Sequence, residues 1–131
     1  MTTATDRSTF LRRSLQLDGI ASGLCGALLL VATPTIAAHF GIASAGIPRA
    51  VGAGLLVFAA ALLWNAARAS VSRAEALVTV ALNAAWVVGS LILVVDGPLT
   101  VLGNVAVAAI AGAVLVFAVL EVLGLRRLRA A

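Results

Sequence analysis

The chain is poor in the residues that most enzyme sites use. Its 131 residues include no tyrosine, one histidine and one cysteine, and every basic residue is an arginine. One cysteine cannot form an internal disulfide, and one histidine with one cysteine gives no cluster for a metal or a haem. The sequence also holds no glycine-rich phosphate loop and no nucleophile with a base and an orienting group. These absences predict a protein that is not an enzyme and uses no cofactor or metal.

Charge is scarce as well. Charged residues make up 11% of the chain and hydrophobic residues 63%, whereas a soluble domain carries about 25% charged residues. A chain of this composition has too few polar side chains to cover a surface in water. We therefore expect its main partner to be the lipid bilayer.

What the sequence does contain is four long apolar stretches. A helix needs about 20 predominantly apolar residues to cross a hydrocarbon layer of about 30 Å. The stretches are rich in alanine and leucine and lack the alternation of a strand. They predict an all-α fold, in which a single domain over residues 1–131 forms a four-helix transmembrane bundle running up, down, up and down. The predicted spans are residues 15–38, 50–67, 75–95 and 99–123.

The arginines indicate how the bundle is oriented, because cytoplasmic loops are rich in basic residues. Only Arg49 falls on one side of the predicted spans, and the other arginines fall on the opposite side. This split predicts that both termini are inside, in a multi-pass protein of the bacterial inner (cytoplasmic) membrane. The net charge of +4 then needs no nucleic acid as a partner. The arginines on the inner side are Arg7, Arg12, Arg13, Arg68, Arg73, Arg126, Arg127 and Arg129.

Arg12 and Arg13 allow two interpretations of the N-terminus. With the residues that follow, they resemble the core of a twin-arginine signal, and a cleavage site is possible near Ala37. The alternative is a retained first helix that these arginines anchor. The retained helix is favoured, because three spans follow it and Asp18 interrupts the start of the apolar region.

Local signals predict several helix boundaries. Ser8 is a possible N-cap of the first helix, which Pro34 kinks or ends. Ser72 with Glu75 three residues later is typical of a capping box at the start of the third helix. The Asp-Gly-Pro turn at residues 96–98 makes the third and fourth helices antiparallel neighbours.

Small residues recur at a spacing of four, which allows helix backbones to approach closely in lipid. We expect these stripes to pack the helices within one chain. A bundle this thin also leaves much of each helix uncovered, which favours a homo-oligomer or a membrane partner protein. The pairs are Gly19 with Gly23, Ser22 with Gly26, Ala85 with Gly89, and Ala108 with Gly112.

Short segments of the first half resemble segments of the second half. The chain is then either a duplicated helical hairpin or a low-complexity membrane sequence with matches by chance. The matching segments are Leu17-Asp18-Gly19 with Leu82-Asn83-Ala84, and Val57-Phe58-Ala59 with Val116-Phe117-Ala118.

Asp18 and Glu121 are polar points within the spans, near the inner ends of their helices. An unpaired carboxylate there costs about 2.5–3.5 kcal/mol on insertion scales, and neither residue has a basic neighbour three or four positions away. One hypothesis is a proton or cation site. The other is an interhelical salt bridge, with a countercharge from Arg13, Arg68, Arg73 or Arg126.

Asn83 lies eight residues past Glu75, which places it about 12 Å along the third span. It is either a ligand-contacting amide beside Trp86 or a partner in an interhelical hydrogen bond. Polar faces on three helices are expected to turn toward one another. The candidate ligand or proton site is Asp18, Asn65, Arg68, Asn83, Trp86 and Glu121.

The segments ALNAAWVV at 81–88 and EVLGLRR at 121–127 resemble small bacterial four-span integral membrane proteins of unknown function. The resemblance extends over nearly the whole chain and implies a fold and a membrane location. Small multidrug-resistance transporters share the size and the span count. Their membrane glutamate sits midway along the first span, whereas Asp18 lies at its inner end and tyrosine is absent. This departure argues against drug–proton antiport.

Two functions remain open from the sequence. The first is a non-enzymatic membrane protein that associates with itself or serves as an accessory subunit of a membrane complex. The second is a minimal transporter or channel with a polar path lined by Asp18, Asn83 and Glu121.

Overall fold

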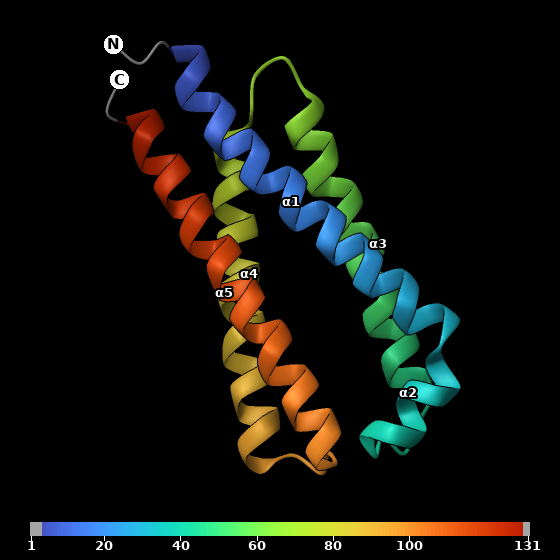
Figure 1. Cartoon of the computed structure of the whole chain (residues 1–131). Coiled ribbons are helices and arrows are strands. Elements are labelled where there is room, and N and C mark those ends of the chain that lie inside the picture. Colours follow the sequence, from blue (N-terminus) through green and yellow to red (C-terminus); the bar gives the residue numbers. More distant parts are fainter. Residues whose placement is uncertain (1–3, 130–131) are drawn as a thin grey trace.

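The fold is an all-α helical bundle, as the apolar stretches predict. The computed structural model describes residues 4–129, and four of its helices are long and apolar enough to cross a membrane. A short fifth helix, which the sequence did not indicate, follows the first. The helices are α1 (Ala4–Val31), α2 (Thr33–Phe40), α3 (Gly46–Ala67), α4 (Arg73–Asp96) and α5 (Val101–Arg129) (Figure 1).

The long helices pack in the order α3, α1, α5, α4. Helix α1 packs along α3 on one side and on α5 on the other, while α4 packs mainly on α5. Helices α3 and α4 touch at few points. Figure 1 shows the start of α1, the end of α5 and the α3–α4 connection at one end of the bundle, which we call the terminal end. Helix α2 and the α4–α5 turn lie at the other end.

The first predicted span, 15–38, is interrupted at Ala32. Helix α1 ends at Val31 and α2 starts at Thr33, with Pro34 in its first turn. Proline is tolerated there because the first turn of a helix leaves its N–H groups without intrahelical partners. Figure 1 shows α2 turning away from the axis of α1. The prediction that Ser8 caps α1 is wrong, because the helix already begins at Ala4.

The N-cap at Ser72 is confirmed. Its hydroxyl accepts the backbone N–H of Glu75 at 3.3 Å. The Glu75 carboxylate does not complete the capping box and instead pairs with Arg68 at 2.8 Å. The turn at 96–98 makes α4 and α5 antiparallel neighbours as predicted, with the Gly97 N–H bonded to the Leu93 carbonyl at 2.9 Å.

The small residues of α1 pack as expected, and those of α4 and α5 do not. A Cβ atom added at Gly26 would lie 2.8 Å from the Gly52 carbonyl oxygen, so α1 and α3 are in backbone contact at this crossing. In contrast, Gly89 and Gly112 are exposed, and added Cβ atoms would meet nothing within 4 Å. The small-residue stripes of α4 and α5 therefore face outward.

The apolar core lies toward the terminal end and draws on all four long helices. Leu11 and Leu15 of α1 and Ala76 of α4 are its fully buried members. At the other end α2 is tied to the start of α5, where the Thr100 N–H donates to the Phe40 carbonyl at 3.1 Å. The core residues are Leu11, Leu15, Leu62, Ala66, Ala76 and Leu125.

Replacing Gly26 by alanine tests the close crossing of α1 and α3. The new methyl group would clash with a backbone carbonyl that cannot rotate away, so we expect a loss of about 1–3 kcal/mol in the free energy of unfolding. Unfolding of the purified protein in mild detergent measures it. Gly54→Ala is the matched control, because its Cβ atom enters open space. Equal stability of the two variants would contradict the close crossing.

Candidate functional site

Three polar side chains from three different helices meet inside the bundle. Asp18 of α1 and Glu121 of α5 are 0% exposed, and Asn83 of α4 is 3% exposed. The Asn83 Nδ2 amide donates to Asp18 Oδ2 at 2.8 Å and to Glu121 Oε2 at 3.2 Å. With Ser22, these residues form what we call the carboxyl–amide cluster.

Donors are divided unequally between the two carboxyl groups. Ser22, one turn beyond Asp18 on α1, donates its hydroxyl to Asp18 Oδ1 at 3.0 Å, so both oxygens of Asp18 accept a hydrogen bond. Glu121 Oε2 accepts only from Asn83. Glu121 Oε1 is buried and finds no donor within the described chain.

The cluster lies deeper in the bundle than the arginines at the terminal end. Asp18 is five residues past Arg13 on α1, and Glu121 is five residues before Arg126 on α5. At 1.5 Å per residue, each carboxyl-bearing residue is about 7–8 Å along the helix from those arginines. Both carboxyl groups therefore belong to the membrane-spanning parts of their helices and not to their ends.

The countercharge expected for these carboxyl groups is not found. In the part of the chain that the structure describes, neither Asp18 nor Glu121 forms an ion pair with an arginine. Arg68 pairs with Glu75 instead, and the Arg127 guanidinium lies over the Phe10 ring, 4.1 Å from its centre. An amide, and not an arginine, joins the acidic residues across the helices.

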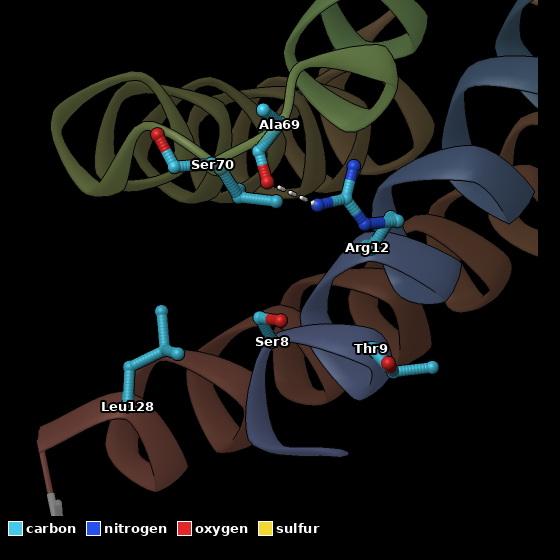
Figure 2. A pocket seen from close by; sticks show the side chains of 7 residues that line it. Ser8, Thr9, Arg12, Ala69, Ser70 and Leu128 are labelled. Carbon is cyan, nitrogen blue, oxygen red and sulfur yellow. Dashed lines mark hydrogen bonds between the residues drawn. The ribbon is translucent and has the colours of Figure 1, made fainter. Parts of the chain in front are cut away.

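Arg12 has a role that its position in the sequence did not reveal. Its guanidinium donates to the carbonyl oxygens of Ala66, of Arg68 at 2.7 Å and of Ala69 at 3.3 Å. Figure 2 shows the contact with Ala69, beside a hollow of about 410 Å³ at the terminal end. Helix α3 has no basic residue in its last turn, so Arg12 of α1 supplies donors to Ala66 at its end and to the carbonyls of Arg68 and Ala69 that follow. That lack of a basic residue was the available sequence signal.

Asn65 and Arg68 belong to the α3–α4 connection and not to the carboxyl–amide cluster. Asn65 is buried; its Oδ1 accepts the Ser72 N–H at 2.7 Å and its Nδ2 donates to the Ser72 carbonyl at 3.2 Å. This exchange closes the loop between the two helices. Arg68 braces the same loop through Glu75.

The structure thus brings together Asp18, Asn83 and Glu121 among the six candidate residues. Trp86 lies one turn beyond Asn83 on α4, and its indole N–H is buried without an acceptor among the described residues. The residue of the cluster that the six candidates did not include is Ser22. Its place four residues after Asp18, on the same helix face, was the signal.

The cluster can form hydrogen bonds and hold protons. In the described part of the chain, no group of three or more histidine, cysteine, aspartate or glutamate side chains could hold a metal ion. Hydrogen bonds between membrane helices contribute about 0.6–2 kcal/mol each. The cluster therefore links α4 to α1, two helices with little backbone contact, as well as to α5.

Replacing Asn83 by leucine tests this link. The change leaves Asp18 Oδ2 and Glu121 Oε2 without their donor, and each buried acceptor left unsatisfied costs about 1–3 kcal/mol. We expect a clear drop in unfolding temperature in mild detergent. Asn104→Leu is the control, because Asn104 Oδ1 already lacks a partner among the described residues. A similar loss of unfolding temperature in both variants would mean that the Asn83 amide stabilises the fold no more than an unpartnered asparagine does.

Comparison with known proteins adds no relative. No protein-family model, no curated protein and no solved structure matches this chain. The resemblance to small bacterial four-span membrane proteins stays a prediction from sequence motifs.

Proposed function

We propose that the protein is a non-enzymatic module of the bacterial inner membrane that associates with copies of itself, either alone or as an accessory subunit of a membrane complex. The observation that carries the proposal is the enclosure of the carboxyl–amide cluster. Asp18 and Glu121 have no exposed surface. Polar groups that lined a permeation path would be open to water, whereas these are used to join helices.

The outward face of α4 and α5 supports self-association. The two helices border a hollow of about 240 Å³, and the residues that line it include Ser90, Ala108, Ala111 and Gly112. Neighbouring Leu91 and Leu115 are more than half exposed. Small residues beside large apolar ones let a second helix approach closely, and dispersion contacts then drive association in lipid.

The arginines support a cytoplasmic location of both termini. The start of α1, the end of α5 and the α3–α4 connection lie at the terminal end of the bundle (Figure 1), where the sequence places every arginine except Arg49. Arg49 is in the first turn of α3, at the opposite end. A strong excess of arginine at one end favours that end as the cytoplasmic one.

A second candidate is a minimal proton- or cation-coupled transporter. It is favoured by one observation, the burial of two carboxyl groups that have no basic partner among the described residues. Ionisable residues within membrane spans commonly mark ion or proton pathways. Transport would require a second conformation in which water reaches Asp18 and Glu121.

Gly112→Leu tests self-association. A leucine there would fill the space that a neighbouring helix needs, so we expect the oligomer to shift toward monomer. Light scattering on the purified protein in mild detergent, with crosslinking in native membranes, measures the shift. Gly54→Leu is the control, because Gly54 is equally open but lies on α3. A wild-type protein that is monomeric both in detergent and in native membranes would contradict the proposed self-association.

A proteoliposome assay separates the module from the transporter. We expect vesicles containing the wild-type protein to dissipate a proton or cation gradient no faster than empty vesicles, because the cluster is enclosed. Gradient-driven flux that disappears in Asp18→Asn or Glu121→Gln, in variants that still fold, would establish transport and overturn the module.

A further inference from the structure

The donor pattern of the carboxyl–amide cluster points to a bound proton. We propose that Asp18 and Glu121 together hold one proton, with Glu121 as the neutral acid and Asp18 as the carboxylate. The inference concerns the ligand of the cluster, which is a proton, and it holds for a module and for a transporter alike.

The first argument is the unequal supply of donors. Asp18 accepts from Ser22 and from Asn83, one hydrogen bond on each oxygen, which suits an ionised carboxylate. Among the residues that the structure describes, Glu121 accepts only on Oε2, and its buried Oε1 has no partner. A carboxylate oxygen in that position would be left without a donor, whereas a protonated Oε1 becomes a donor itself.

The second argument is the closeness of the two carboxyl groups. Both accept from the same Asn83 nitrogen, Asp18 Oδ2 at 2.8 Å and Glu121 Oε2 at 3.2 Å, so the two carboxyl groups are neighbours around one atom. Two ionised carboxylates have only acceptors and cannot bond to each other. One proton on Glu121 supplies an O–H donor beside the Asp18 carboxylate.

The third argument is the position of the other charges. Two buried like charges repel each other, and removing them from water is expensive unless a countercharge is near. Apart from Asp18 and Glu121, the charged side chains that the structure describes on the long helices lie at or near the helix ends. They are Arg7, Arg12 and Arg13 on α1; Arg49 on α3, with Arg68 just after it; Arg73, Glu75 and Asp96 on α4; and Arg126, Arg127 and Arg129 on α5. The other titratable group nearby on α1 is Cys25, two turns past Asp18, which is a half-buried thiol.

The bound proton makes stability depend on pH with a definite sign. The folded bundle holds a proton that a carboxyl group in water releases below neutral pH. Where the folded state binds more protons than the unfolded state, the free energy of unfolding falls as pH rises. Alkaline conditions therefore weaken the contact between α1, α4 and α5.

Infrared spectroscopy of the full chain in lipid tests the proposal without touching the cluster. The chain has two glutamates, Glu75 and Glu121, so in Glu75→Gln a carbon-13 glutamate label reports Glu121 alone. We expect the carbonyl stretch of a neutral carboxyl group at neutral pH, shifted by the label. Absence of a neutral glutamic acid signal at neutral pH would overturn the proposal.

Glu121→Gln provides the second test, since its amide has the shape of the neutral acid but cannot lose a proton. We expect the neutral carboxyl band to disappear and the unfolding temperature to become less sensitive to a rise from neutral to alkaline pH. Glu75→Gln should keep the wild-type sensitivity, because Glu75 is exposed. A band that persists in Glu121→Gln, or an equal alkaline loss in both variants, would refute the assignment to Glu121. Neither result depends on whether the protein self-associates or transports ions.

Discussion

The bundle depends on the rule that polar groups in a membrane must find partners within the protein, because lipid offers them none. Asn83 meets this requirement by bonding to side chains of other helices. Its single amide nitrogen serves carboxyl groups on two other helices, and α4 has little other contact with α1. Asn83 therefore joins α4 to α1, while the packing of α4 on α5 holds the helix along its length.

The same rule organises the terminal end of the bundle. At the end of α3, Arg12 reaches across from α1 and donates to the carbonyls of Ala66, Arg68 and Ala69. Asn65 satisfies the backbone of Ser72 in the loop that follows. These polar contacts surround the apolar core that contains Leu11 and Leu15. Packing and polar satisfaction thus occur in the same layer, while the other end is tied by α2.

Features that depend on local composition could be predicted from the sequence. The four long helices, the cap at Ser72, the antiparallel pair α4–α5 and the packing face of α1 at Gly26 follow from hydropathy, turn residues and small-residue spacing. Features that depend on the rotation of one helix against another could not. Depth alone placed Asn65 and Arg68 beside Asp18, but in the structure their side chains turn to the α3–α4 loop. The outward orientation of the small-residue stripes on α4 and α5 could not be predicted for the same reason. The spacing of small residues identifies a smooth helix face but not the helix that packs on it.

The hydrogen bond between Asp18 and Asn83 has a consequence for the two halves of the chain. The two residues occupy matching places in the similar segments 17–19 and 82–84, and they meet each other in space. Two aspartates there would repel each other, and the Asp18 position would then face Glu121 without the Asn83 amide that donates to both. An acid opposite an amide instead fits donor to acceptor in one direction only. The hairpin α1–α3 is thus complementary to the hairpin α4–α5 and not to a copy of itself, so the fold carries a chemical distinction between its halves that its shape alone does not provide.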